Sequence, residues 1–329
     1  MITQSQFRPI FGLSNAHLQT LLPFLLKKST YRNSGRQTLE LDDGDFLDLS
    51  WLCEPKDGRP IVVLFHGLEG SIDSHYSRTI MQAIQQQGWT ALLMHFRGCS
   101  HRPNRLAHSY HSGGTEDARY LLGWLKQNYP ASALAAVGVS LGGNMLLKLQ
   151  AEYGDSSPLK AAVSICAPVQ LDLCATRLNQ GLSRIYQWHL IKQLNQKLRN
   201  KVEQFDIAKL IGLNKKDIKQ IKTFWQFDDR VTAPLHGFKD VHDYYGRCSA
   251  RQYLKDIRKP TLMIHALDDP FMQRDSLPDD SELSDSIELE LSQHGGHIGF
   301  VSGSLARPVF WLQQRVPEYL LEFIADESV

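Results

Sequence analysis

The chain contains little cysteine and no paired cysteine motif. Its 329 residues include five scattered cysteines without CxxC spacing: Cys53, Cys99, Cys166, Cys174 and Cys248. Disulfide frameworks and zinc sites use cysteines in pairs at short, regular spacing. The pattern therefore predicts reduced thiols in a cytoplasmic protein and argues against a disulfide-stabilised or zinc-bound fold.

Long hydrophobic runs are also absent. A membrane-spanning helix needs about 18 or more apolar residues in a row, whereas the N-terminal run 18–26 (LQTLLPFLL) is short and contains Pro23. Lys27 and Lys28 follow this run, and a signal peptide has its positive charge first. We expect an N-terminal helix packed on the body and no transmembrane segment. Peripheral membrane contact stays open as an alternative, because the apolar residues of this segment would form one face.

No charge of one sign dominates. Lys and Arg number 36, Asp and Glu number 35, and the net charge is +1. No basic run is long enough to follow a nucleic-acid backbone, so we expect a small-molecule partner and no nucleic acid. The length allows one large α/β core with an inserted subdomain, and the sequence does not indicate an oligomeric state.

The motif 138–142 (GVSLG) lies directly between two apolar stretches. Residues 134–137 (LAAV) are typical of a short buried strand, and 143–150 has apolar residues at helical spacing. Strand, sharp turn and helix are the context of a G-x-S-x-G nucleophile elbow, with the serine hydroxyl at the tip of the turn. The sequence therefore predicts Ser140 as a catalytic nucleophile, with the positive end of the next helix directed at the reaction site.

Strands and helices alternate along most of the chain. A hairpin at 38–51 is followed by predicted strands at 60–65, 89–96, 134–137, 160–165, 260–265 and 286–291, with helices at 77–87 and 115–128. An antiparallel hairpin followed by this alternation predicts an α/β protein with a mostly parallel central sheet flanked by helices, which is the α/β-hydrolase layout.

The region between the predicted strands at 160–165 and 260–265 contains only helical patterns. These lie at 185–201, 205–211 and 215–224. A structureless loop of this length is implausible in a compact domain, so we predict a helical cap inserted after the sixth core strand. The predicted organisation is an N-terminal segment at 1–36 packed on the body, a core formed by 37–168 and 256–329, and a cap insertion at 169–255.

A catalytic serine needs a histidine to accept its proton and a carboxylate to orient that histidine. In this fold the acid follows the serine along the chain, just past the strand after the cap. Residues 264–270 (IHALDDP) occupy that place. We predict Asp269 as the acid, and Asp268 is an open alternative whose other role would be to cap the turn.

The histidine comes from a late loop after the last strand. Residues 293–300 (QHGGHIGF) form such a loop. We predict His297 as the base, since Gly295 and Gly296 free the loop to bring it over the serine. His294 lies nearer the strand end.

An oxyanion hole takes two backbone N–H groups. We predict one at Leu141, directly after the serine, and the other at Leu68 in 66–70 (HGLEG), the loop after the third strand. His66 and Glu69 in that loop lack a second spaced histidine, so we expect no metal site there.

The chain resembles the YheT-like hydrolases, bacterial proteins of the AB hydrolase 4 family within the α/β-hydrolase superfamily, related to the ABHD-type eukaryotic esterases and lipases. The resemblance covers nearly the whole chain and rests on 12–20 (GLSNAHLQT), 66–70 (HGLEG), 96–99 (FRGC), 110–113 (YHSG), 138–143 (GVSLGG), 227–234 (FDDRVTAP), 236–238 (HGF), 244–245 (YY), 268–270 (DDP) and 295–300 (GGHIGF). It implies a serine carboxylesterase or lipase-like activity with a triad at Ser140, Asp269 and His297.

The predicted function is hydrolysis of carboxylic esters through an acyl-serine intermediate, on short- to medium-chain acyl esters or lipids. No cofactor is expected. An acyltransferase or thioesterase on the same triad is one alternative, and a noncatalytic ligand-binding protein with the hydrolase fold is another.

Overall fold

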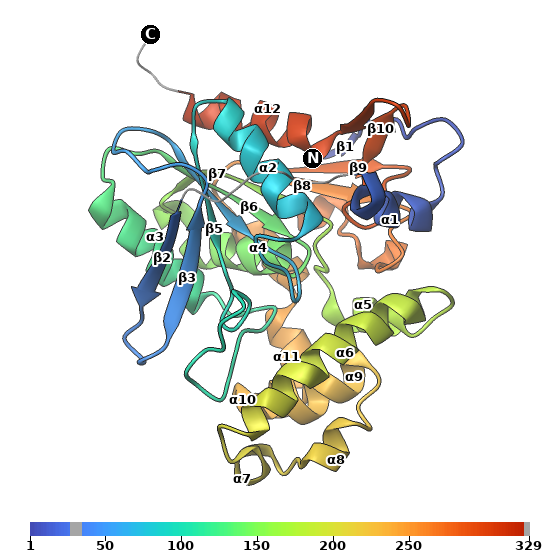
Figure 1. Cartoon of the computed structure of the whole chain (residues 1–329). Coiled ribbons are helices and arrows are strands. Elements are labelled where there is room, and N and C mark those ends of the chain that lie inside the picture. The colour runs from blue at the N-terminus through green and yellow to red at the C-terminus, as the bar shows by residue number, and fades with distance from the viewer. Residues whose placement is uncertain (27–34, 326–329) are drawn as a thin grey trace.

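The computed structural model describes residues 1–26 and 35–325. Their main feature is a nine-stranded sheet in the order β1-β9-β8-β7-β6-β4-β5-β3-β2 (Figure 1). Its strands are β1 (Ile2–Gln4), β2 (Gly35–Glu40), β3 (Phe46–Trp51), β4 (Ile61–Phe65), β5 (Thr90–Met94), β6 (Leu134–Val139), β7 (Leu159–Ile165), β8 (Thr261–Ala266) and β9 (Ile287–Ser292). Only the β2–β3 and β3–β5 pairs of this sheet are antiparallel. The predicted α/β-hydrolase fold, with its mostly parallel sheet, is confirmed.

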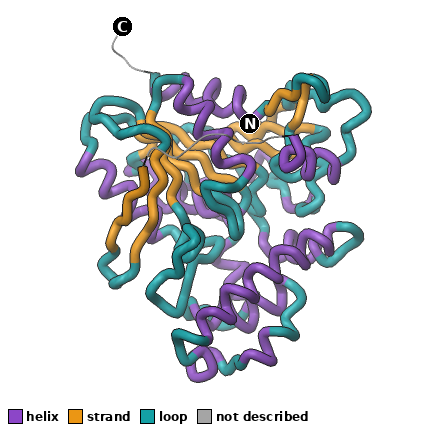
Figure 2. The backbone as a smooth tube through the Cα atoms, in the orientation of Figure 1, coloured by secondary structure: helices purple, strands orange, loops and turns teal. Residues whose placement is uncertain are grey.

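The central strands are buried along their whole length. Every residue of β4, β5 and β6 is buried, which explains their continuous apolar sequences. Helices α2 (His75–Gln86) and α12 (Leu312–Ile324) pack on one face, and α3 (Glu116–Asn128) and α4 (Leu141–Tyr153) pack on the other (Figure 2). The sheet therefore holds the carboxyl ends of its parallel strands at fixed positions along one edge.

The N-terminal segment contains more than the predicted helix. Helix α1 (Ala16–Leu26) forms as expected, but β1 precedes it and pairs in parallel with β9, Ile2 opposite Leu289. Three residues are too few to show a period-2 pattern, so this edge strand has no signal in the sequence. The basic pair at 27–28 lies outside the described residues.

The chain between β7 and β8 is helical. It contains α5 (Leu171–Leu178), α6 (Ser183–Val202), α7 (Ile207–Ile211), α8 (Lys215–Ile218), α9 (Phe224–Phe227), a π-helical turn (Asp228–Thr232), α10 (Ala233–Leu235), α11 (Val241–Cys248) and a 3₁₀ helix (Ala250–Asp256). Figure 1 shows α6 to α11 gathered in a group beyond the edge of the sheet. The predicted single helix at 215–224 is wrong: α8 and α9 are separate, because Asn214 and Thr223 each cap the start of a new helix.

A small hairpin lies near the end of the chain, and three short turns lie between earlier elements. Strands β10 (Val301–Gly303) and β11 (Pro308–Phe310) pair antiparallel, and 3₁₀ turns lie at Gly154–Ser156, Arg274–Ser276 and Asp280–Glu282. Within the described ranges, no helix combines the length and the apolar character needed to cross a membrane.

Candidate active site

Ser140 lies at the sharp turn between β6 and α4. Its backbone has φ 52° and ψ −118°, a combination that is strained for a residue with a side chain. A Cβ on Gly138 would overlap the carbonyl oxygen of Gly142, and a Cβ on Gly142 would overlap the carbonyl oxygen of Phe65. Both glycines are therefore required by close backbone approach, and the turn directs Ser140 into the cavity beside it.

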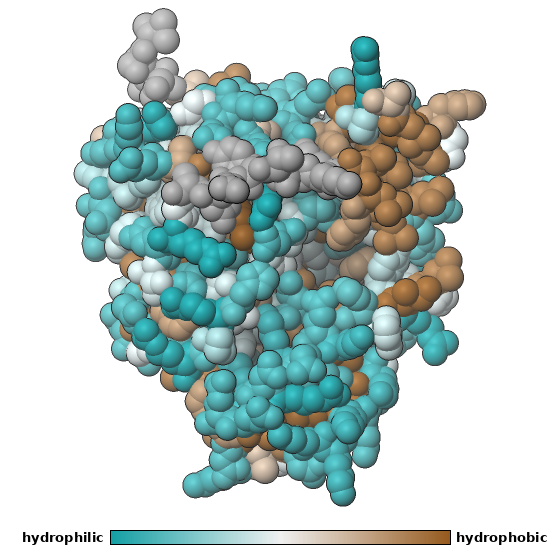
Figure 3. Space-filling view, viewed as in Figure 1, coloured by the Kyte–Doolittle hydropathy of each residue, from teal (hydrophilic) through white to brown (hydrophobic). Residues whose placement is uncertain are grey.

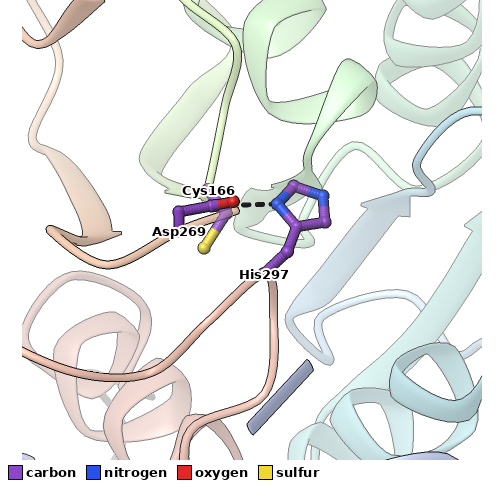
Figure 4. Close-up of side chains that lie close together, drawn as sticks. All are labelled: Cys166, Asp269 and His297. Atoms are coloured by element: carbon purple, nitrogen blue, oxygen red, sulfur yellow. Dashed lines mark hydrogen bonds and ion pairs between the residues drawn. The ribbon is translucent and has the colours of Figure 1, made fainter. Parts of the chain in front are cut away.

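Asp269 and His297 lie beside Ser140 in an unbroken hydrogen-bonded chain. With the imidazole proton on Nδ1, His297 donates to Asp269 Oδ2 at 2.8 Å, and its Nε2 accepts from Ser140 Oγ at 3.1 Å. The Asp269 and His297 side chains are almost fully buried, at 1% and 7% exposure. Figure 4 shows the carboxylate and the imidazole pointing toward each other. This geometry suits proton transfer from the serine hydroxyl.

Asp268 lies in the same turn but points elsewhere. Its Oδ1 accepts from the Gly296 N–H at 2.9 Å, and its Oδ2 lies 3.4 Å from Nδ1 of His294. His294 itself is 45% exposed. Of the two adjacent carboxylates, the structure therefore brings Asp269 to His297 and uses Asp268 to tie down the loop that carries it.

Phe271 is a neighbour of the site that the residue pattern does not predict. Its ring stacks on the His297 imidazole, with centroids 3.9 Å apart and planes 4° from parallel. Its N–H donates to Asp269 Oδ1 at 2.8 Å. The segment 268–271 thus supplies both the Asp269 carboxylate that contacts His297 and the Phe271 N–H that binds the second oxygen of this carboxylate. It also supplies the Phe271 ring that packs against the imidazole.

The loop at 66–70 follows β4 and approaches Ser140. The Gly67 N–H donates to the Tyr76 hydroxyl at 2.7 Å, and the Glu69 N–H donates to the Tyr110 hydroxyl at 2.8 Å. The backbone is therefore held on both sides of Leu68. Leu68 and Leu141 line the cavity with Ser140, and their N–H groups have no acceptor among the described residues.

A buried acid connects this loop to helix α6. Glu69 Oε1 accepts from the Tyr110 hydroxyl at 2.8 Å and from Lys197 Nζ at 3.0 Å. The Glu69 side chain is 4% exposed and that of Lys197 is 34% exposed. The ion pair thus ties α6 to the loop that carries Leu68, so the position of the helical region and that of the loop are coupled.

Helix α1 holds the loop of His297 from the other side. The His297 N–H donates to Thr20 Oγ1 at 2.9 Å, in a buried bond. The Gln19 side chain donates to Val301 O at 3.2 Å and accepts from Val301 N at 2.8 Å. A Cβ on Gly296 would overlap the carbonyl oxygen of Ala16. The contact between α1 and this loop is therefore close and specific.

Replacing Thr20 with valine should weaken both the fold and turnover. The shape is kept, but the buried His297 N–H loses its acceptor, which costs about 1–3 kcal/mol. We expect a lower denaturation midpoint and a kcat reduced by about tenfold, with KM little changed, because the His297 loop is displaced from Ser140. Thr20→Ser keeps the hydroxyl and should restore kcat. Equal loss in the serine and valine variants would contradict a positioning role for the hydroxyl.

Cys166, Asp269 and His297 offer ligand atoms within 4.8 Å of one another (Figure 4). A metal would have to displace the bond between His297 and Asp269. It would also need a thiolate, whereas burial and the nearby Asp269 carboxylate raise the pKa of Cys166 well above its usual value. The arrangement therefore fits the hydrogen-bonded chain of Asp269, His297 and Ser140 better than a metal centre.

A large cavity opens at Ser140. Its volume is about 730 Å³, and the helices after β7 supply much of its wall, including Leu171, Leu178, Leu194, Leu198, Phe224 and Phe227. Burial lowers the pKa of His111 to about 3 and that of His236 to about 4, and it raises the pKa of Asp228 to about 6. These two of the histidines that line the cavity are therefore uncharged at neutral pH, and the leucine and phenylalanine side chains of the wall suit an apolar group.

The fold and the site define the chain as an α/β hydrolase. The family model described as "alpha/beta hydrolase fold" matches residues 60–304, and the chain belongs to this family. It is 42% identical over 328 residues to YheT of Escherichia coli (strain K12), whose name carries the word esterase; the match covers 99% of this chain and 96% of that protein. The predicted membership among the YheT-like hydrolases is therefore confirmed.

Further relatives have names from the same class of enzyme. A monoacylglycerol lipase of Saccharomyces cerevisiae is 31% identical over 252 residues, which are 74% of this chain and 55% of that protein. Phospholipase ABHD3 of Bos taurus is 26% identical over 98% of this chain and 80% of that protein. Among solved structures, the Pyrococcus furiosus esterase Pf2001 shares the fold, with a TM-score of 0.55 and 16% identity over 90% of this chain and 94% of that chain. These relatives place the chain among the carboxylic ester hydrolases.

Proposed function

We propose that this protein hydrolyses carboxylic esters through a covalent acyl-serine intermediate. The observation that carries the proposal is the hydrogen-bonded chain from Ser140 through His297 to Asp269, at 3.1 and 2.8 Å, beside an apolar cavity. A serine in a strained turn with a buried imidazole and carboxylate behind it is the arrangement used for acyl transfer.

The reaction follows from these positions. Ser140 Oγ attacks the ester carbonyl carbon while His297 Nε2 takes its proton, and Asp269 stabilises the imidazolium that forms. The N–H groups of Leu68 and Leu141 donate to the developing oxyanion. The intermediate then collapses, and His297 returns the proton to the leaving alcohol. Water, activated by His297, attacks the acyl-serine and releases the acid. No cofactor takes part.

The helical region at 169–255 is proposed to act as a cap over this site, with 37–168 and 256–329 as the core and 1–36 as a segment packed on it. Support comes from the separate apolar cluster that the α5 to α11 helices form and from their share of the cavity wall. Because the wall is apolar, the cap would select the acyl chain of a small-molecule ester or lipid.

The five free cysteines favour a reducing compartment such as the cytoplasm.

The proposal predicts ester turnover with a chain-length optimum. We would measure hydrolysis of p-nitrophenyl esters from acetate to palmitate, and we expect kcat/KM to rise with chain length and then fall once the cavity is full. Each buried CH₂ contributes about 0.8 kcal/mol, or roughly a fourfold gain per carbon, until that point. No hydrolysis of any ester by the folded protein would contradict the proposal and favour a ligand-binding role. Ester products formed with an added alcohol, or acyl-CoA turnover in place of ester turnover, would indicate acyl transfer or thioester cleavage by the same serine.

A further inference from the structure

Exposed apolar side chains gather around the entrance of the cavity. Thirteen large apolar side chains are exposed among the described residues, and eight of them lie on α1, just before it, or at the start of α6: Phe11, Leu18, Leu21, Phe24, Leu25, Leu182, Ile185 and Trp188. We call these eight the apolar rim. Figure 3 shows hydrophobic side chains collected over the α1 region and a smaller group near the turn between α5 and α6.

The apolar rim is continuous with the cavity that contains Ser140. Five of its members also line the cavity, namely Leu21, Phe24, Leu182, Ile185 and Trp188. The two helices that carry the rim are joined where His17 of α1 bonds to the Tyr186 hydroxyl of α6 at 3.0 Å. An apolar path therefore leads from the surface, between α1 and α6, to the serine.

The rim helices lie in two stretches that contain no acidic residue. Residues 1–39 and 173–202 contain none of the chain's 35 Asp and Glu, although its net charge is only +1. Their described residues include eight Lys and Arg: Arg8, Arg36, Arg177, Arg184, Lys192, Lys197, Arg199 and Lys201, of which Lys197 is paired with Glu69. Arg184 and Lys192 are exposed beside the rim, and Lys192 Nζ lies 5.3 Å from the Trp188 ring centre.

We propose that the apolar rim docks onto an anionic lipid surface, so that acyl chains enter the cavity directly from that surface. Apolar and aromatic side chains on a helix with basic neighbours are the composition that binds the interface of anionic bilayers. A second copy of the chain is a poorer fit, because two rims would bring like charges together. The delivery of substrate from the lipid surface rests on the proposed ester hydrolysis, whereas docking of the apolar rim does not depend on it.

The test is vesicle flotation of the full chain carrying Ser140→Ala, so that lipid is not consumed. Vesicles of phosphatidylcholine alone are compared with vesicles containing phosphatidylglycerol. The rim variant is Phe11→Gln/Leu25→Gln, two side chains that do not line the cavity. The matched control is Leu210→Gln/Leu321→Gln, which replaces two exposed apolar side chains on α7 and α12.

We expect binding to the anionic vesicles, weaker binding to phosphatidylcholine, and a loss of roughly tenfold or more in the rim variant but not in the control. In a background with Ser140, the rim variant should hydrolyse p-nitrophenyl acetate at the wild-type rate. Absence of vesicle binding at low salt, or equal binding by the rim and control variants, would overturn the proposal. A dimer that the rim variant dissociates, without vesicle binding, would overturn it in favour of self-association. Binding with no ester turnover in any background would uphold docking and contradict the proposed function.

Discussion

Replacing Ser140 with alanine should lower kcat by roughly 10⁴- to 10⁶-fold while leaving the protein folded. This substitution removes the proposed nucleophile. The groups behind the hydroxyl cannot replace it, because His297, whose Nε2 lies 3.1 Å from Ser140 Oγ, takes up the proton and Asp269 orients the imidazole. The Ser140 backbone bond to Ile165 O at 2.8 Å does not involve the side chain, so the turn is kept. Initial rates with a p-nitrophenyl ester and a thermal denaturation curve measure both effects.

A glycine variant separates loss of chemistry from loss of fold. Ser140 has φ 52°, and a strained backbone of this kind costs about 1–3 kcal/mol when the residue has a Cβ. Ser140→Gly should therefore be at least as stable as the wild type and equally inactive. Activity within about tenfold of the wild type in either variant would show that Ser140 is not the nucleophile.

Replacing Asp269 with asparagine should lower kcat by about 10⁴-fold, because an amide favours the wrong imidazole tautomer and cannot stabilise the imidazolium. Asp268→Asn is the matched control on the neighbouring carboxylate. Its bond to the Gly296 N–H at 2.9 Å can still be made by an amide oxygen. A hydrogen bond contributes about 0.5–1.5 kcal/mol, so Asp268→Asn should cost no more than about tenfold.

The same pair of variants decides between the two carboxylates. Steady-state kinetics of both proteins are measured on one ester, with circular dichroism to check that each is folded. The reverse ranking, with Asp268→Asn the more damaged, would contradict the assignment of Asp269 as the residue that orients His297.

The central part of the site was predictable because its signals are local in the sequence. The glycines of 138–142 are required by contacts between the turn and the adjacent backbone, and those contacts impose the same pattern wherever this turn is used. The buried parallel strands have continuous apolar sequences, so these strands and the loops that follow them could be recognised from the pattern. Ser140 and the late histidine loop are therefore identifiable from the sequence alone.

The sequence pattern predicted Asp269 as the acid but left Asp268 open as an alternative. The two residues are identical and adjacent, and they differ only in where the turn after β8 directs each carboxylate. The bond from the Phe271 N–H to Asp269 Oδ1 and the contact of Asp268 with the Gly296 N–H decide their directions. Both hydrogen bonds depend on the backbone conformation of the turn, which the residue pattern does not determine.

The roles of the residues that support the site were not predicted, although Thr20 lies in the motif 12–20 and Glu69 in the motif 66–70. Thr20 reaches His297 across 277 positions of the chain, and Lys197 reaches Glu69 across 128. Thr20 and Lys197 are each a single polar residue in a helix, and periodicity does not distinguish them from polar residues that face solvent. Their roles follow from the packing of α1 and α6 against the core, which periodicity does not determine.

The most direct test of the acyl-serine mechanism is the intact mass of the protein mixed rapidly with a slowly turned-over ester, followed by peptide mapping. The account predicts a mass increase equal to one acyl group, located on the peptide that contains Ser140, absent in Ser140→Ala and lost as the acid product is released. Turnover of the ester with no acylated protein, or an acyl group on another residue that disappears at the rate of turnover, would contradict it.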